Sequence, residues 1–187
     1  IASGTDGNLI TFDASGNPAY VATGSDGQVL TSAGAGQPCA FETVASLRQG
    51  VFVTRGTTQA IAHNTPTKIQ FATENYDPNG DFDNSSDFDY TVASGEGGVY
   101  LIHGNLNLED LGDAKIVTCL IYKNGSLLVG SGEYHASHAQ SRGAGVTVTA
   151  VLAEGDLITL YVYHNHGSSR NIDDNVTLNR LCVQRIL

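Results

Sequence analysis

Residues 77–89 form an acidic run whose side chains could bind a metal ion. Four oxygen-bearing side chains stand at alternate positions: Asp77, Asn79, Asp81 and Asp83. Carboxylate and amide oxygens at this spacing are typical of the opening of a calcium loop. Phe88 stands where an EF-hand has its bidentate Glu, so a calcium site here would be of another kind. The other interpretation is a solvated acidic loop between two strands.

His164 and His166 form a second pair that could bind a metal ion, at the end of an apolar run. The run occupies residues 157–163, and if its strand continues through the pair, both imidazoles point to one face. On a threefold axis, three such pairs would present an octahedral set of ring nitrogens, which suits a transition metal. The other interpretation is a surface loop that holds two ordinary histidines.

Tyrosines recur among the apolar runs of the C-terminal part. The ones considered are Tyr100, Tyr122, Tyr134, Tyr161 and Tyr163. We interpret them as aromatic residues of a core or an interface. The alternative is that one or two of them lie exposed at a tip and stack on sugars.

The sequence contains no recognisable catalytic motif. It has no G-x-S-x-G elbow, no G-x-x-x-x-G-K-[ST] phosphate loop and no H-E-x-x-H helix. We therefore expect a protein that is not an enzyme, and we assign no residue a catalytic role.

The composition argues against two classes of partner. The chain has 187 residues and a net charge of −10 with only nine Lys and Arg, so it lacks the basic face that nucleic acids require. Its longest uncharged apolar runs are about five residues, against the roughly 20 that cross a bilayer. We expect neither nucleic-acid binding nor membrane insertion. Because the sequence contains no Met, we expect it to be the ordered or processed end of a longer polypeptide.

The sequence has three cysteines, which is a small and odd number and does not suit a disulfide framework. Cys119 and Cys182 lie in apolar runs, whereas Cys39 follows a Gly-rich stretch. One interpretation makes Cys119 and Cys182 small buried hydrophobic residues. The other is a bridge between the two.

From about Gly50 onward, short β-type runs recur at intervals of about 8 to 12 residues, with turn-forming residues between them. Asn124 and Gly125 lie between two apolar runs, and both tolerate the positive φ of a type I′ hairpin turn. The pattern predicts an all-β domain, a sandwich or a barrel. In residues 146–152 and 157–163 the outward positions are often apolar, so we expect both faces to be covered.

Residues 4–21 and 24–41 form an internal repeat with a shift of twenty positions. The recurring residues are Gly4, Asp6, Gly7, Thr11, Gly16 and Pro18, which return as Gly24, Asp26, Gly27, Thr31, Gly36 and Pro38. Each copy predicts a turn at Asp-Gly and two short strands joined by a Gly-rich turn. Such units become stable by stacking or by wrapping with identical chains. The alternative is a flexible Gly-rich linker.

The second copy of this repeat resembles the short Gly-rich repeats in the shafts of bacteriophage tail and head fibres. Its QVLTS block is followed by Pro38 and Phe41 in the order of that family. The resemblance covers about residues 4–42. It implies that residues 1–45 are a β-hairpin repeat shaft of a fibre on the virion surface, joined to other virion proteins on its N-terminal side.

A series of motifs recurs in a fixed order after residue 50. Their residues are Phe71, Asn75, Tyr76, Asp77, Gly80 and Phe82, then Gly98 and Tyr100, then Asn124 and Gly125, and finally Leu152, Gly155 and Asp156. This order resembles the globular head of the complement-1q family, a trimeric jelly roll related to tumour necrosis factor. The sequence departs from the family at Ile102, where an aromatic is usual. The resemblance implies that residues 46–187 are a homotrimeric jelly-roll β-sandwich.

Two function hypotheses follow from the two resemblances together. The first is a structural and adhesive virion protein, a homotrimeric fibre whose head binds a host-surface glycan or protein. The second is a secreted recognition or signalling domain of the complement type. A virion anchor on the N-terminal side would favour the first, whereas a signal peptide and occupied sequons at Asn84, Asn124 and Asn175 would favour the second. We expect the first, because only a fibre accounts for the repeat.

Overall fold

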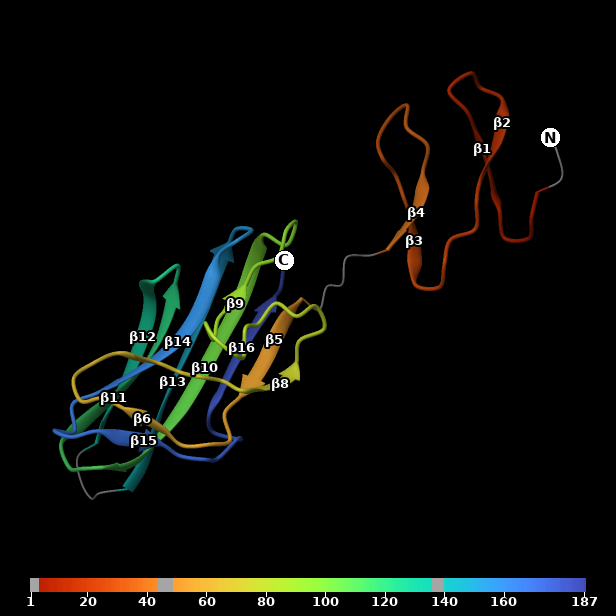
Figure 1. Ribbon diagram of the computed structural model, residues 1–187. Helices are drawn as coiled ribbons and strands as arrows, with labels where there is room; N and C mark the ends of the chain where they lie inside the picture. Colours follow the sequence, from red (N-terminus) through yellow and green to blue (C-terminus); the bar gives the residue numbers. More distant parts are fainter. Residues whose placement is uncertain (1–3, 44–48, 136–139) are drawn as a thin grey trace. The chain divides into compact units, whose positions relative to one another are not determined.

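The computed structural model describes residues 4–43, 49–135 and 140–187, and every regular element in these ranges is a β-strand (Figure 1). The chain divides into two compact units between residues 47 and 48. The described residues include no helix that could span a membrane. The all-β class predicted from the sequence is confirmed.

The first unit consists of two β-hairpins, one for each copy of the repeat. β1 (Leu9–Phe12) pairs with β2 (Pro18–Val21), and β3 (Gln28–Thr31) pairs with β4 (Ala40–Thr43). In the first turn the carboxylate of Asp13 accepts the backbone N–H groups of Ser15 (2.8 Å) and Asn17 (2.9 Å). These hairpins are the strands and turns that the repeat predicts.

The two hairpins differ in strand register, although their sequences repeat. Leu9 pairs with Val21, whereas Val29, which is twenty positions after Leu9, pairs with Glu42. An exact repeat would pair Val29 with Phe41. The longer turn between β3 and β4 allows this slip of one residue, and such a slip moves side chains to the other face of a strand.

The larger sheet of the second unit has seven strands. Six follow the order β6-β15-β10-β16-β5-β8, and the seventh, β13, also pairs with β10. Its strands are β5 (Gly50–Thr54), β6 (Gln59–Ile61), β8 (Thr73–Tyr76), β10 (Gly98–Leu111), β13 (Gln140–Leu152), β15 (Arg170–Ile172) and β16 (Arg180–Arg185). The first and last strands of the unit are therefore neighbours. Gln49 O accepts the N–H of Arg185 at 2.8 Å, directly beside this pair.

The smaller sheet has five strands, in the order β12-β11-β14-β7, with β9 also on β14. Its strands are β7 (Thr67–Lys68), β9 (Tyr90–Thr91), β11 (Lys115–Lys123), β12 (Ser126–His135) and β14 (Leu157–His164). The turn between β11 and β12 is the predicted hairpin, with φ angles of 51° at Asn124 and 75° at Gly125. The positive φ at both residues is the reason this dipeptide stands here.

The two sheets pack face to face over one hydrophobic core, because alternate residues of the long strands point inward. The inward positions of β10, β11, β14 and β16 include Tyr100, Ile102, Leu106, Val117, Ile121, Ile158, Leu160, Val162, Leu181 and Val183. Gly104 lies among them in the middle of β10. A Cβ atom on Gly104 would lie 2.3 Å from Cδ1 of Leu160 on β14, so the sheets approach closely here.

All three cysteines are free thiols. Cys119 is fully buried in the core, and burial raises the pKa of its thiol to about 12. Cys182 is half-buried on β16. The alternative of a Cys119 to Cys182 bridge is therefore wrong, and the interpretation of Cys119 as a small buried hydrophobic residue is confirmed.

Candidate functional site

The acidic run of residues 77–89 is a loop that its own carboxylates organise. Oδ1 of Asp77 accepts the backbone N–H groups of Gly80 and Asp81, both at 3.0 Å, and Oδ2 accepts that of Phe82 at 2.9 Å. Three donors from a single turn thus meet one carboxylate. Asp77 fixes the path of the chain around Gly80, whose φ is 72°.

Asp83 organises the second half of the loop in the same way. Its carboxylate accepts the N–H of Ser85 and of Ser86, both at 2.8 Å, and the Ser86 hydroxyl at 2.6 Å. These hydrogen bonds, led by the Ser86 hydroxyl, lower the pKa of Asp83. The side chain is therefore ionised at neutral pH and already engaged with its neighbours.

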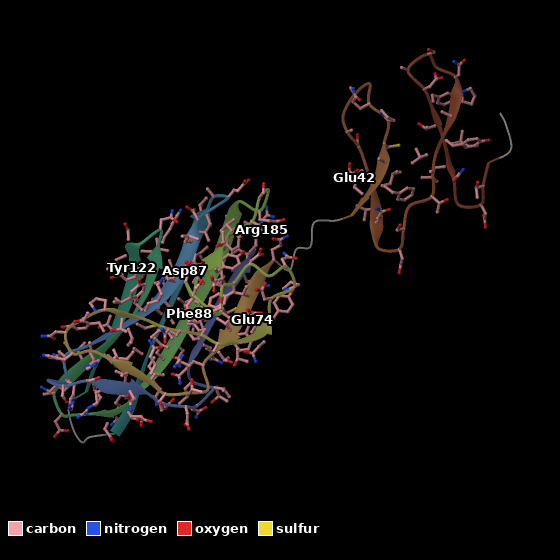
Figure 2. All side chains as sticks on the ribbon, viewed as in Figure 1. Glu42, Glu74, Asp87, Phe88, Tyr122 and Arg185 are labelled. Carbon is pink, nitrogen blue, oxygen red and sulfur yellow. The ribbon has the colours of Figure 1, made fainter. Side chains whose placement is uncertain are left out.

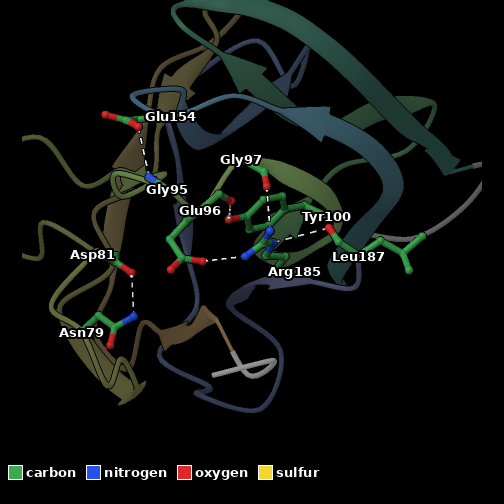
Figure 3. A network of polar contacts seen from close by, with 9 residues as sticks. All are labelled: Asn79, Asp81, Gly95, Glu96, Gly97, Tyr100, Glu154, Arg185 and Leu187. Atoms are coloured by element: carbon green, nitrogen blue, oxygen red, sulfur yellow. Dashed lines mark hydrogen bonds and ion pairs between the residues drawn. The ribbon is translucent and has the colours of Figure 1, made fainter. Parts of the chain in front are cut away.

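Asp81 and Asn79 are the other two predicted calcium ligands, and they lie beside a polar network at one end of the sandwich (Figure 3). Partial burial raises the pKa of Asp81, although the Asn79 amide, 3.4 Å away, opposes this. No three Asp, Glu, His or Cys side chains of the described ranges form a group that could hold a metal ion. The structure thus does not gather the four predicted ligands around one point, and calcium binding stays a prediction.

The neighbouring network joins the last strand to the loop before β10. The guanidinium of Arg185 donates to Glu96 Oε2 (2.7 Å) and Gly97 O (2.8 Å), and the hydroxyl of Tyr100 donates to Glu96 O (2.6 Å). Glu154 accepts the N–H of Gly95 at 3.0 Å, as Figure 3 shows. These polar groups satisfy one another, so the network stabilises this end of the head.

His164 is the last residue of β14, and it is an internal side chain. Its exposed fraction is 0%, its Nδ1 accepts the backbone N–H of His166 (3.2 Å), and its Nε2 lies 3.1 Å from Ile61 O. Because Nδ1 accepts a proton donor, the proton of the neutral ring sits on Nε2 and is donated to Ile61. Both ring nitrogens are therefore used within the chain.

His166 lies beyond the end of β14, so the condition under which both imidazoles would point to one face is not met, and metal binding by this pair stays a prediction. Nδ1 of His166 accepts the N–H of Gly112 at 3.0 Å, and Nε2 contacts the guanidinium of Arg170. A cation next to the ring opposes the binding of a metal cation there. The chain turns after the strand: Oδ1 of Asn165 accepts the N–H of Ile116 on β11 (2.7 Å), and the N–H of Gly167 donates to Nδ1 of His63 (3.1 Å).

We expect the free energy of unfolding of the second unit to decrease as the pH falls below 6.5, because His164 and His166 are held neutral in the folded state. Burial lowers the pKa of His164 and of His166 below the ordinary 6.5, and the nearby charges of Arg170 and Lys115 act in the same direction on His166. A histidine whose pKa is lower in the folded state than in the unfolded state binds its proton more readily after unfolding. Its contribution to the free energy of unfolding is therefore fully present above the unfolded-state pKa and is lost as the pH falls.

Urea unfolding at pH 7.5 and pH 5.5 measures this loss. The variant His164→Gln, whose amide can donate and accept as the neutral ring does, should lose less stability on acidification than the natural chain. Equal stability of the natural chain at both pH values would contradict the assignment.

The outward side of the larger sheet forms what we call the β10 face. It consists of the outward positions of β5, β16, β10 and β13, and includes Phe52, Leu101, His103, Thr149, Val151 and Cys182. Leu101 is 39% exposed and Val151 is 74% exposed. At the β5 and β16 end this face contains an open cavity of about 330 Å³, lined by Phe52, Tyr76 and Cys182 among others.

The outward side of the smaller sheet carries aromatic residues, and we call it the tyrosine face. Its residues on β11 and β14 are Thr118, Leu120, Tyr122, Thr159, Tyr161 and Tyr163. Tyr122, Tyr161 and Tyr163 are each partly exposed, whereas Tyr100 belongs to the core. The spacing of Tyr161 and Tyr163 is the sequence signal for this face, since alternate residues of a strand share a side.

No protein-family model matches this sequence, and no curated protein matches it. Solved structures do. Eiger, a TNF from S. frugiperda, superposes with a TM-score of 0.57 at 11% identity, over 75% of this chain and 93% of that one. Murine APRIL at pH 5.0 superposes with a TM-score of 0.55 at 12% identity, over 73% of this chain and 99% of that one. The globular domain of zebrafish complement 1qA protein superposes with a TM-score of 0.52 at 15% identity, over 74% of this chain and 97% of that one.

The second unit is a jelly roll. Its fold is that of the TNF and complement-1q domains, which confirms the resemblance inferred from residues 50–187 at the level of the fold. The matched share of the chain is the share that the second unit makes up. The resemblance of residues 4–42 to fibre repeats stays a prediction.

Proposed function

We propose that this chain is a structural and adhesive virion protein, a homotrimeric fibre whose jelly-roll head binds the surface of a host cell and does not act as an enzyme. The observation that carries the proposal is the β10 face. The chain has a net charge of −10, yet no outward position of β5, of β16, of β10 between Val99 and Asn105, or of β13 between Gly145 and Val151 holds a carboxylate. Arg180 is a charged residue on this face, at the end of β16. A large face without carboxylates and with exposed apolar side chains suits burial against other copies.

The hairpins of the first unit support the same assembly. Their exposed hydrophobic side chains are Leu9 (41%), Ile10 (67%), Phe12 (66%), Val29 (44%) and Leu30 (45%). Val21 is the single buried hydrophobic residue among the described residues of this unit. A two-stranded hairpin without a packed face is marginally stable in water, so contacts between chains would stabilise these repeats.

The second candidate function, a secreted recognition or signalling domain, uses the same head. The likeness to a complement 1qA domain is the observation that favours it. Asn84, Asn124 and Asn175, the asparagines of the three sequons, are all exposed. Glycans on these residues in the natural protein would favour secretion over a virion.

Native mass spectrometry of the full chain tests the assembly. We expect a particle of three times the 19.6 kDa chain mass. Leu101→Asp, which puts a charge in the centre of the β10 face, should shift the particle towards the monomer. Ala72→Asp, at an exposed position outside this face, is the matched control and should remain trimeric.

Binding to host cells tests the function with the same proteins. Three linked heads should bind about 10² to 10⁴ times more strongly than the monomeric variant, because contacts after the first are intramolecular. The bound surface should release no shorter saccharides. A monomeric natural chain, or a trimer that cleaves the surface polysaccharide, would contradict the proposal.

A further inference from the structure

Four basic side chains gather at one end of the sandwich, where three segments of the chain meet. They are His63, which follows β6, Lys115, the first residue of β11, His166, which follows β14, and Arg170, the first residue of β15. All four are partly exposed. We call these four residues the basic cluster.

Backbone groups hold the side chains of the basic cluster in place. The N–H of Gly167 donates to Nδ1 of His63 at 3.1 Å, and the N–H of Gly112 donates to Nδ1 of His166 at 3.0 Å. A Cβ atom on Gly112 would lie 3.1 Å from Cε1 of His166 and 4.0 Å from Cγ of Lys115. Both side chains therefore pass close to this glycine, and the cluster is one site with fixed rings.

The basic cluster offers hydrogen-bond donors and lacks acceptors for them. A neutral imidazole has one N–H, and Nδ1 of His63 and of His166 each accepts a backbone N–H, so the proton of each ring sits on Nε2. Nε2 of His166 contacts the guanidinium of Arg170, which can only donate. Nε of Arg170 is buried and has no hydrogen-bond partner among the described residues. An acceptor beside the ring and the guanidinium would satisfy both groups.

No carboxylate neutralises this cluster within the described ranges. The ion pairs found there are formed by Lys123 and by Arg185, and neither Lys115 nor Arg170 has a carboxylate at ion-pair distance. Burial lowers the pKa of His166, and the positive charges of Arg170 and Lys115 lower it further. This is a local excess of positive charge in a chain whose net charge is −10. An anion would supply the missing acceptor and the missing negative charge together.

The basic cluster and the start of the second unit lie at opposite ends of the sandwich. Gln49 O accepts the N–H of Arg185, a residue that Figure 2 labels. Along β10, Tyr100 pairs with Arg185 and Leu108 pairs with Ile172 of β15, so these two places are about 25 Å apart. β6 and β15 lie at the end opposite the C-terminus (Figure 1). An adhesive head that is attached through Gln49 leaves this other end free to meet a host surface.

We propose that the basic cluster binds an acidic saccharide of the host surface, with a carboxylate or phosphate group of the saccharide held by Arg170, His166 and Lys115. A guanidinium binds such groups through parallel N–H donors, and hydrogen bonds between ionised partners are stronger than those between neutral ones. Nε2–H of His63 is a further donor at the border of the site. This inference rests on the proposed function and names the ligand class and the site.

An acidic segment of another protein is the alternative occupant, and the surroundings of the cluster favour the saccharide. None of the exposed large hydrophobic side chains found in the described ranges lies within residues 62–66, 112–115 or 165–170. Protein interfaces depend on buried aromatic and apolar anchors, which these segments lack. Their exposed residues include Asn64, Thr65 and Ser168, whose amide and hydroxyl groups complement the hydroxyl groups of a sugar ring.

The test is an array of neutral, carboxylated and phosphorylated saccharides, probed with the full natural chain and with variants that each remove one positive charge. Lys115→Gln and Arg170→Gln should each weaken binding to the acidic saccharides by about tenfold or more, because each removes a charge-assisted hydrogen bond. Arg170→Lys keeps the charge without the parallel donors, so its affinity should lie between those of the natural chain and Arg170→Gln. Added salt should weaken binding, because it screens partly exposed charges.

Lys123→Gln is the matched control. Lys115 and Lys123 are the first and last residues of β11, so the two variants change the net charge equally at opposite ends of one strand. Lys123 forms a partly exposed ion pair with Asp156, and the loss of such a pair has a small effect on stability. This variant should bind acidic saccharides as the natural chain does. An equal loss in Lys115→Gln and Lys123→Gln would show that net charge governs binding, which contradicts the inference.

The other outcomes separate this inference from the proposed function. If the natural chain binds host cells but binds only neutral saccharides or none on the array, or if the basic-cluster variants bind equally well, the inference is wrong and the adhesive function stands. Binding to polyglutamate as tight as binding to the saccharides would assign the cluster to an acidic protein and would also overturn it. Native mass spectrometry and urea unfolding of each variant distinguish lost binding from lost folding. If the natural chain binds neither cells nor saccharides, the proposed function itself fails.

Discussion

Replacing Gly104 by alanine is expected to lower the free energy of unfolding by about 2 kcal/mol, at a fixed protein concentration. The added Cβ would lie 2.3 Å from Cδ1 and 2.9 Å from Cδ2 of Leu160, which is 1% exposed. Leu160 cannot move away without displacing other residues of the core, because protein interiors are close-packed. Equilibrium unfolding in urea measures the change, and Gly104→Val should prevent folding.

Two further variants show whether the contact with Leu160 is the cause. Gly97→Ala is the matched control, since a Cβ there would lie 3.5 Å from the nearest atom, Leu152 O, at ordinary contact distance. It should change stability by less than about 0.5 kcal/mol. Leu160→Val shortens the opposing side chain, and in the double variant it should recover part of the loss as a coupling free energy. Additive effects of the two substitutions would argue against the contact.

Asn179→Ala is expected to destabilise the head by about 3 kcal/mol, the second large effect. Asn179 is fully buried, and its Oδ1 accepts the backbone N–H of Asn107 at 2.9 Å. Its Nδ2 donates to the backbone O (2.9 Å) and Oδ1 (2.7 Å) of Asp173. Alanine would leave a buried N–H and a carboxylate without these partners, and each unmet group costs free energy in a low-dielectric interior.

Asn179→Asp separates the roles of the two ends of this amide. It keeps the acceptor for Asn107 but places a second carboxylate beside Asp173, which Asn107 also contacts. We expect it to be at least as destabilising as Asn179→Ala at pH 7, because two carboxylates then lie side by side. The difference in stability between the two variants should become smaller as the pH is lowered, because protonation of one carboxyl relieves the repulsion. A constant difference between the two variants across this range would contradict the proximity of the carboxyls.

The strands were predictable because their cause is local. Period-2 apolar patterns, interrupted by turn residues, define the inward faces of β10, β11 and β14, and the Asn124-Gly125 turn follows from the φ angles that these two residues tolerate. The jelly-roll fold also followed from the order of motifs along the chain. The alternation and the turn are each contained within a few neighbouring residues. The motifs are recognised by their order along the chain, even where the residues between them differ from the family.

The candidate sites were less predictable, because they depend on partners far along the sequence. The partners of His164 and His166 include Ile61 and Gly112, more than fifty residues away, and no spacing in the sequence reveals them. The acidic run contained the right ligand atoms for calcium. Whether a carboxylate faces a cation or a backbone N–H is decided by the turn it occupies, as Asp77 shows.

The adjacency of β5 and β16 has a consequence for how the head can be rewired. Gln49 O meets the N–H of Arg185, and Gly50 pairs with Gln184, so both ends of the jelly-roll chain lie at one place on the sandwich. A short peptide could join Leu187 to Gln49, and the chain could be opened at the exposed Asn124-Gly125 turn. Such a circular permutant would keep every strand pair of the jelly roll and would lose only the covalent connection through that turn. It would carry its new termini at the turn between β11 and β12, where a label or a second binding module could be attached.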